Sequence, residues 1–340
     1  MIHIIDIIVP LYNVKQEFLR RCLASILMQT IVPNVIVVDD CSAVDYSQII
    51  DSFGKLMPLK YIKLEKNMGV GHARKVGTQN CNSQYLMFID SDDLFYTSFS
   101  VEKLYKAINK DNSIDFVTGS FIQETDKGEL MKCDENSSWV FARIYRRSFL
   151  EANEITFSDE RLNEDVGFIQ LCRACSKKNT IIKDAIVLWK YNTNSLTRSA
   201  TGNYKKDGTF SFARNLINVE KEKQKRGIEK NKVSRTQICD GLSVLYWYLV
   251  KFTYKETVER CEDFMKMIQE YYNTIGLPLE WYQDNQMFTE RFFLSSKSMD
   301  SVAIECVPKF SIYEMLKDLE DNKDESANPA EFGYEFGVNK

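Results

Sequence analysis

Short apolar runs alternate with amphipathic segments through the first half of the chain. Strands are predicted at the β-branched runs, residues 4–9, 35–38, 60–64, 85–89 and 114–117. Helices are predicted where apolar residues recur at helical spacing, at 15–29, 45–56, 70–80 and 99–110. Because alternating strands and helices of this length build parallel sheets, we expect an α/β fold with a mostly parallel sheet flanked by helices. Ligands bind such sheets outside the carboxyl ends of the strands.

Composition limits the class of protein. The 340 residues, 44% hydrophobic and 27% charged, are typical of an ordinary globular protein. At roughly 100 to 200 residues per domain, this length predicts two domains. A formal net charge of -4 argues against nucleic acid as a partner.

Two apolar stretches resemble export or membrane signals but do not meet the requirements of either. IHIIDIIVP, at residues 2–10, lacks the basic region and cleavage site of a signal peptide, so we expect a first core strand there. The longest apolar run, LSVLYWYLV at 242–250, is well short of the ~20 residues that a membrane span needs. The 9 cysteines lie in mostly apolar surroundings, which indicates a reducing compartment. We therefore expect a cytoplasmic protein, with attachment to the inner face of the membrane left open.

The ends of the predicted strands carry the polar motifs. They are VPLYN at 9–13, VVDDCS at 37–42, EKNMGVGHARKVG at 65–77 and DSDD at 90–93. Because these ends should meet at one edge of the sheet, an aromatic ring, an acid pair, a glycine turn with an arginine and an acid cluster come together there. This set fits a nucleoside diphosphate bound with a metal ion.

The glycine motif does not bind a dinucleotide in the usual way. Arg74 stands where the third glycine of that fingerprint would fall. What remains is a glycine turn leading into a helix that carries Arg74, which suits an anionic group, with a plain loop as the alternative. His72 lies in the same turn, where a nucleotide contact stays open.

The acid cluster does not match a calcium-binding EF-hand loop, since Leu94, Phe95 and Val101 occupy positions that need an oxygen ligand, a glycine and a glutamate. A solvated acidic turn remains the alternative. Its position beside the other motifs favours Mg²⁺ or Mn²⁺, which takes one or two carboxylates and completes its shell with phosphate oxygens and water. The cation would offset the repulsion between the acids.

In this order and at these intervals, the motifs VPLYN, VVDDCS, NMGVGHARKVG and FIDSDD resemble the N-terminal domain of family 2 glycosyltransferases. NEDVGF at 163–168, an acid pair that opens a helix, continues the family pattern, and the resemblance covers roughly residues 3–200. It implies the Rossmann-like A-type glycosyltransferase fold. It also implies a metal-dependent, inverting hexosyl transfer from a nucleotide sugar, a UDP-sugar, to a glycan or cell-surface polymer, as in polysaccharide biosynthesis.

The resemblance also implies roles for individual residues. The donor-binding positions are Pro10, Tyr12, Asn13, Asp40, Asn67, Arg74, Asp90, Ser91, Asp93 and Arg198. Pro10 and Tyr12 would border the nucleobase, with Tyr12 against its face, and Asp40 would bond the base edge. Asn67 and Arg74 would lie in the nucleotide pocket.

The acid cluster would be the DXD motif of the family. Asp90 would lie near the ribose and the metal, Asp92 would bind the metal directly, and Asp93 would approach the donor sugar. Asp165 would be the catalytic base, with Glu164 beside it. An acceptor hydroxyl is a weak nucleophile, so a carboxylate must take its proton as the new bond forms, and a single displacement inverts the sugar.

Two positions depart from the family pattern. Lys75 follows the motif arginine where asparagine is common, and Cys41 replaces glycine in the familiar DDGS turn. A separate C-x-x-C, Cys172 and Cys175, lies on a helix predicted at 166–176. It is better explained by packing than by zinc, because no second cysteine or histidine pair accompanies it.

The character of the chain changes after WKYNTNSLTRSA at 189–200, where Ser195 or Arg198 is expected near the diphosphate. We predict a catalytic domain at 1–203, a helical C-terminal region at 204–322 and a flexible tail at 323–340. The helical patterns at 233–253 and 256–272 support the second part. Its segment LYWYLVKF, 245–252, is most simply a buried helix face. Binding of an acceptor polymer, of a membrane surface or of a second subunit in a homo-oligomer stays open.

Two other functions are compatible with parts of this pattern, a nucleotidyltransferase and a glycan-binding module. A nucleotidyltransferase would carry a glycine-rich basic loop directly after its first strand, where this chain has VPLYNVKQEF without glycine. A glycan-binding module without turnover would not need the acid cluster and the base together. Both alternatives are therefore less favoured than the transferase.

Overall fold

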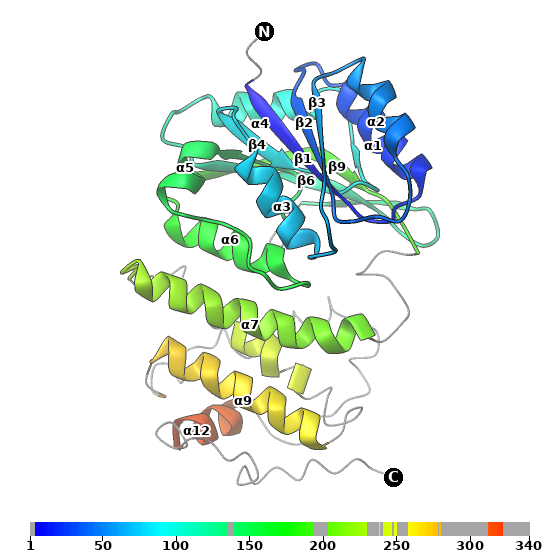
Figure 1. The fold of residues 1–340 in the computed structure, drawn as a ribbon. Coiled ribbons are helices and arrows are strands. Elements are labelled where there is room, and N and C mark those ends of the chain that lie inside the picture. The colour runs from blue at the N-terminus through cyan, green and yellow to red at the C-terminus, as the bar shows by residue number, and fades with distance from the viewer. Residues whose placement is uncertain are drawn as a thin grey trace. The chain divides into compact units, whose positions relative to one another are not determined.

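The first half of the chain alternates strands and helices in the predicted order (Figure 1). The computed structural model describes residues 4–134, 136, 139–193, 203–229, 238, 241–246, 248–249, 258–277, 279 and 312–321. The predicted elements are found as β1 (Ile5–Leu11), α1 (Gln16–Leu27), β2 (Asn34–Asp39), α2 (Ser47–Gly54), β3 (Leu59–Lys63), α3 (Val70–Gln79), β4 (Tyr85–Phe88), α4 (Ser100–Ile108), β6 (Phe116–Glu124) and α6 (Glu164–Cys175). Elements that were not predicted are β5 (Leu94–Phe95), β7 (Leu130–Cys133), β8 (Arg143–Arg146), α5 (Arg147–Ala152) and β9 (Asn179–Trp189).

The strands of the described residues form one mixed sheet. Its order is β3-β2-β1-β4-β8-β6-β9-β5, and β7 pairs with β6 outside this path. The part β3-β2-β1-β4 is parallel, as predicted. In the other part β8 runs antiparallel to β4 and β6, while β6 and β9 are parallel. The antiparallel pairing of β6 and β7 follows from the short turn between them, in which the Thr125 amide donates to the Glu129 carbonyl at 2.9 Å.

One face of the sheet packs against α1, α2 and α4. Side chains alternate between the two faces along a strand, so Ile7 and Val9 of β1 point the same way. They lie in one core with Leu19 of α1, Ile49 of α2 and Leu104 of α4. Each fully buried side chain of this size contributes about 1.5–3 kcal/mol to folding.

The opposite face packs against α3 and α6. Ile8 of β1 is paired with Phe88 of β4, so both side chains point to this face. Gly77 lets α3 approach closely, because a Cβ at that position would lie 2.4 Å from Ile8 Cγ2. The Phe88 ring lies 5.3 Å from the Phe157 ring, which stacks on Phe168 of α6 with centroids 4.2 Å apart. The sheet is therefore covered on both faces, which leaves its edges and strand ends to contact ligands.

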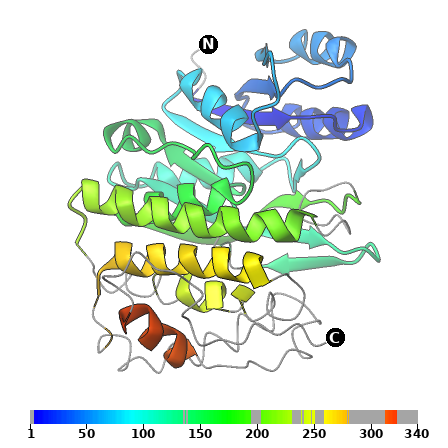
Figure 2. The same ribbon diagram turned by 60° about the horizontal axis from the view of Figure 1, so that its bottom comes forward.

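The chain divides into two units, Met1–Tyr204 and Lys205–Lys340. The described part of the second unit includes the helices α7 (Asn203–Lys225), α9 (Val258–Ile275) and α12 (Ile312–Asp321). Figures 1 and 2 show α7 and α9 side by side, and Lys221 forms an ion pair of 2.7 Å with Glu270 between them.

The second unit has its own apolar core, to which the predicted aromatic segment contributes. Leu245, Tyr246 and Leu249 are buried there together with Leu216 of α7 and Phe264 of α9. The described part of LYWYLVKF is thus a buried helix face. Within the described residues, no helix is long and apolar enough to cross a membrane. The predicted tail at 323–340 lies outside the described residues.

Candidate functional site

The ends of β1, β2 and β4 meet at one edge of the sheet. β1 pairs in parallel with both β2 and β4, so the polar residues that follow these strands lie beside one another. Tyr12, directly after β1, has 52% of its surface exposed and is available to a flat ligand such as a base. The next residue, Asn13, is bonded to the turn after β2. Its amide donates to Ser42 Oγ at 2.9 Å, and its Oδ1 accepts from the Ala43 amide at 2.9 Å.

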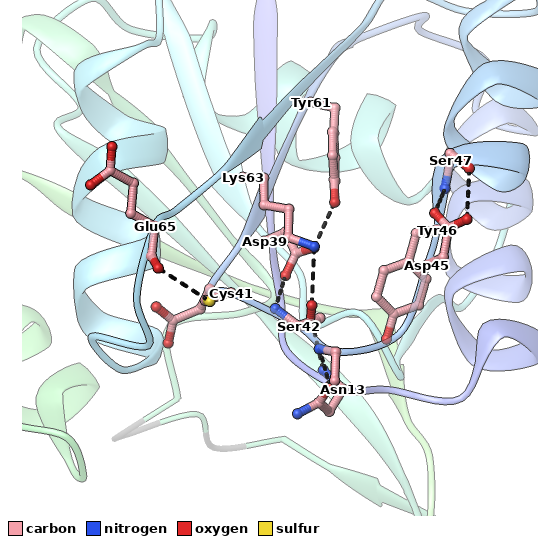
Figure 3. Close-up of polar contacts among 12 residues, drawn as sticks. Asn13, Asp39, Cys41, Ser42, Asp45, Tyr46, Ser47, Tyr61, Lys63 and Glu65 are labelled. Atoms are coloured by element: carbon pink, nitrogen blue, oxygen red, sulfur yellow. Dashed lines mark hydrogen bonds and ion pairs between the residues drawn. The ribbon is translucent and has the colours of Figure 1, made fainter.

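Asp39 fixes the turn after β2 through hydrogen bonds (Figure 3). Its fully buried carboxylate accepts a hydrogen bond from the Ser42 amide at 2.8 Å and another from the Tyr61 hydroxyl at 2.5 Å. Burial and the bond to Asp39 raise the pKa of Tyr61, so this hydroxyl stays a donor. Lys63 Nζ donates to the Ser42 carbonyl at 3.0 Å. Asp39 therefore shapes the turn and was not predicted to do so.

Cys41, which replaces the glycine of the familiar DDGS turn, adopts the backbone conformation that the glycine would have. Its φ is 64°, in the left-handed region that glycine adopts at no steric cost. Its Sγ donates to the Glu65 carbonyl at 3.4 Å, a contact drawn in Figure 3 that glycine does not make. The turn thus keeps the geometry of a glycine turn with a cysteine in place.

Asp40 binds the glycine turn that precedes α3. Its carboxylate is buried and accepts hydrogen bonds from the amides of Met68 and Gly69, both at 2.7 Å. Gly69 has a φ of 96°, which only glycine adopts readily. Asn67 Nδ2 donates to the Asp40 carbonyl at 3.4 Å. The two predicted nucleotide contacts therefore lie together, and Asp40 also fixes the loop beside them.

Arg74 on α3 lies between two carboxylates. Its NH2 group bonds Asp90 Oδ1 at 2.6 Å, and its NH1 group bonds Glu164 Oε1. Burial alone would lower the pKa of Arg74, but Asp90 and Glu164 outweigh it and the pKa is raised, so the guanidinium stays charged. This side chain joins the acid cluster after β4 to the start of α6. Lys75, the other departure from the family pattern, forms an ion pair of 3.6 Å with Asp159.

The acid pair Glu164 and Asp165 opens α6, as predicted. Asn163, before the helix, has a left-handed φ of 57° and turns the chain into it. Burial raises the pKa of Glu164, although Arg74 opposes this. Burial and the adjacent Glu164 raise the pKa of Asp165 to about 8. A carboxylate with a raised pKa is a stronger base, which suits removal of a proton from a hydroxyl.

The acid cluster after β4 is tied to the segment that follows β9. Asp93 Oδ1, buried, accepts from the Lys190 amide at 2.9 Å, and Asp92 Oδ2 accepts from Asn192 Nδ2 at 2.8 Å. Glu124 at the end of β6 bonds Lys190 Nζ at 2.6 Å and the Tyr191 amide at 2.8 Å. These contacts were not predicted from the sequence, although WKYN, at 189–192, begins the segment that was expected near the diphosphate. Ser195 and Arg198, the two residues expected to contact the diphosphate, lie outside the described residues.

Two carboxylates of the acid cluster are of the ligand type that Mg²⁺ and Mn²⁺ prefer. Asp90 and Asp92 present carboxylate oxygens, and the Asp90 side chain is 34% exposed. Within the described residues, no group of three or more His, Cys, Asp or Glu side chains is placed to hold a metal ion. Mg²⁺ and Mn²⁺ commonly bind one or two carboxylates and take their other ligands from phosphate and water. On α6, Cys172 is buried and Cys175 is half-buried.

The predicted donor-binding positions within the described residues lie near the ends of β1, β2 and β4, in the loop before α3 or on α3 itself. They are Pro10, Tyr12, Asn13, Asp40, Asn67, Arg74, Asp90, Ser91 and Asp93. Pro10 and Ser91 are buried, whereas Tyr12 and Asn13 are exposed. His72, in the first turn of α3, is half-buried.

Residues 6–167 match the family described as Glycosyl transferase family 2. Glycosyltransferase GlyA of Streptococcus pneumoniae is 40% identical over 31% of this chain and 15% of its own length. The uncharacterized glycosyltransferase EpsJ of Bacillus subtilis is 25% identical over 58% of this chain and 64% of its own length. The chain thus spans less than two thirds of the length of these two relatives.

A third relative covers more of the chain. The poly(ribitol-phosphate) beta-N-acetylglucosaminyltransferase TarP of Staphylococcus aureus is 23% identical over 80% of this chain and 88% of its own length. Among solved structures, S. aureus TarS 1-349 in complex with UDP-GlcNAc has a TM-score of 0.63 and 17% identity, covering 94% of this chain and 90% of that one. At this identity the likeness concerns the fold, and it confirms the predicted A-type glycosyltransferase fold.

Proposed function

The chain belongs to glycosyltransferase family 2 through residues 6–167, and from this we propose that it transfers a sugar from a UDP-sugar to a glycan or glycan-like polymer. The observation that carries the proposal is the contact of Arg74 with both Asp90 and Glu164. This contact brings the donor acid cluster and the acid pair with the predicted base to one place. A donor site and a base at the same edge are what a direct transfer requires.

The donor is proposed from the exposed ring and from the relatives. Tyr12 offers its face to a base at the edge where Asp40 and Asn67 lie. TarS was crystallised with UDP-GlcNAc, and TarP is named as an N-acetylglucosaminyltransferase, so UDP-GlcNAc is the first donor to test. A thermal-shift screen of nucleotide sugars is the direct experiment, because a ligand bound by the folded state raises the melting temperature. No shift with any nucleotide sugar or with UDP would contradict the proposal.

The reaction follows from the charges at the site. Asp165 takes the proton of the acceptor hydroxyl while the acceptor oxygen bonds the anomeric carbon. The bond from that carbon to the diphosphate oxygen breaks, and UDP leaves with the electron pair. One displacement inverts the anomeric centre.

We also propose that Asp90 and Asp92 hold Mn²⁺ or Mg²⁺. The cation, when bound, neutralises charge on the leaving diphosphate. Asp92→Asn should remove metal-dependent binding of UDP while the fold, followed by circular dichroism, is retained. Unchanged activity of the wild-type protein in excess chelator would contradict the metal proposal.

The helical unit at 204–322 is proposed to select the acceptor, because the motifs assigned to the donor and the base all precede residue 170. TarP, named for a polymer acceptor, matches 80% of this chain and therefore extends into this unit. Attachment to a membrane and self-association through this unit remain predictions. Sedimentation with anionic vesicles and light scattering of the purified protein test them.

A further inference from the structure

Arg74 lies between the acid cluster after β4 and α6, the helix that carries the predicted base Asp165. Its two terminal nitrogens face different carboxylates, Asp90 at the end of β4 and Glu164 at the start of α6. The Arg74 side chain is 5% exposed and the Glu164 side chain 6%, so this ion pair is shielded from water. The sequence predicted that Arg74 binds an anionic group of the ligand. In the structure both terminal nitrogens instead bond carboxylates of the protein.

An arginine is required for this bridge. The guanidinium is a planar fork that bonds two carboxylates from opposite ends, whereas a lysine ammonium is a single point charge. Removing one partner of a buried ion pair leaves a charge uncompensated, so the position of Glu164 depends on Arg74. A lysine at position 74 would keep the charge but could not hold both acids in their present places.

Packing around the bridge makes the coupling rigid. One helical turn before Arg74, Gly71 lies so close to α6 that an added Cβ would be 2.8 Å from Glu164 Cγ. The Arg74 guanidinium also lies 5.9 Å from the centre of the Phe157 ring. Because Glu164 precedes Asp165 in the first turn of α6, a displacement of Glu164 also displaces Asp165.

We infer that Arg74 is a positioning residue, an inference that rests on the proposed function. Arg74 links Asp90 to Glu164 and thereby fixes Asp165 relative to the donor. It acts through Glu164 and need not touch the substrate. The alternative role is direct contact with the nucleotide through Nε, which is buried and has no hydrogen-bond partner within the described residues. The two roles differ in what they do to donor affinity.

The test compares Arg74→Lys, Glu164→Gln and the double variant with the wild-type chain. Arg147→Lys is the matched control, since Arg147 forms an ion pair of 2.5 Å with Glu151 on α5 and was assigned no part in the reaction. UDP affinity is measured by calorimetry, turnover by release of UDP from UDP-GlcNAc in the presence of acceptor and Mn²⁺, and local order by hydrogen exchange of residues 161–175.

For a positioning role, Arg74→Lys lowers kcat at least about tenfold while the Kd for UDP changes by less than about threefold. Hydrogen exchange at 161–175 becomes faster, and the double variant is no worse than the worse single variant, because both changes break one bridge. Arg147→Lys leaves all three readouts unchanged.

A loss of UDP affinity as large as the loss of kcat/KM, or unchanged exchange at 161–175, would overturn the positioning role. Failure of the proposed function looks different, since the wild-type chain itself would then release no UDP from UDP-GlcNAc or from any other nucleotide sugar. In that case exchange at 161–175 and UDP affinity in Arg74→Lys still decide whether the bridge orders α6.

Discussion

Gly71 on α3 lies against Glu164 on α6 with no room for a side chain between them. A Cβ at residue 71 would stand 2.8 Å from Glu164 Cγ, closer than Cβ atoms approach other atoms in folded proteins, and 3.1 Å from Glu164 Cβ, which is tighter than most such contacts. The backbone of the glycine motif is thus fitted to the helix that carries the predicted base. In this motif, a glycine that the sequence associates with phosphate binding also sets the distance between two helices.

Gly71→Ala should force α3 and α6 apart. Overpacking of this kind costs about 1–3 kcal/mol, and Glu164 is too buried to move aside freely. We expect a lower free energy of unfolding in urea and a lower kcat. Gly54→Ala is the control, because a Cβ at Gly54 of α2 meets nothing within 4 Å. Equal stability of the two variants would show that α3 and α6 can repack around an added methyl group at little cost.

Asp40→Asn should loosen the glycine turn. Both carboxylate oxygens accept backbone amides, of Met68 and Gly69, and an amide nitrogen in place of one oxygen would face a donor. A buried group left without its partner costs about 1–3 kcal/mol, which chemical denaturation measures. Asp45→Asn, just before α2, is the control, since Asp45 is exposed and asparagine keeps an oxygen that can accept the Ser47 amide. A similarly small effect at both sites would contradict the structural role of Asp40.

Cys41→Gly tests the left-handed turn after β2. Residue 41 has a φ of 64°, which costs an L-residue other than glycine about 1–2 kcal/mol. Glycine relieves this strain and loses only the weak bond from Sγ to the Glu65 carbonyl. We expect Cys41→Gly to be at least as stable as the wild type and Cys41→Val to be less stable. The reverse order in thermal unfolding would mean that the thiol contact outweighs the strain.

The parallel half of the sheet and the place of the site were predictable from the sequence, because both follow from short-range patterns. Apolar runs marked β1 to β4, and the polar residues after them had to meet at the same edge. The antiparallel strand β8 was not predicted, since its pairing depends on contacts with β4 and β6, which lie far from it in the sequence. The same holds for the contact between Asp93 and Lys190, which are 97 positions apart.

The pH dependence of stability follows from the raised pKa of Asp165. Because the folded state favours its protonated form, Asp165 stabilises the protein fully below the ordinary carboxyl pKa of about 4. This contribution is lost as the pH rises towards the folded value of Asp165, about 8. Between these limits the free energy of unfolding should fall with pH more steeply in the wild type than in Asp165→Asn. Asp159→Asn, which alters an exposed acid, is the control and should leave the slope of the wild type unchanged. A free energy of unfolding that does not change with pH in the wild type would contradict the raised pKa of Asp165.

The pH dependence of transfer has the opposite sign. Asp165 accepts a proton only when it is ionised, so kcat/KM should rise with pH across the range in which Asp165 titrates in the free enzyme. The rise should be centred above the ordinary carboxyl value, because burial and Glu164 raise the pKa of Asp165. A rate that is already maximal at pH 5 would show that the group controlling transfer is not Asp165.

The central claim is that Asp165 does the chemistry at a donor site that other residues form. The measurement that tests it most directly is the turnover of Asp165→Asn with UDP-GlcNAc and acceptor, compared with its affinity for UDP. Asparagine keeps the shape but cannot take the proton, so turnover should fall by about 10² to 10⁴ while the Kd for UDP stays close to that of the wild type. Full turnover in this variant, or a loss of UDP affinity that matches the loss of turnover, would contradict the account.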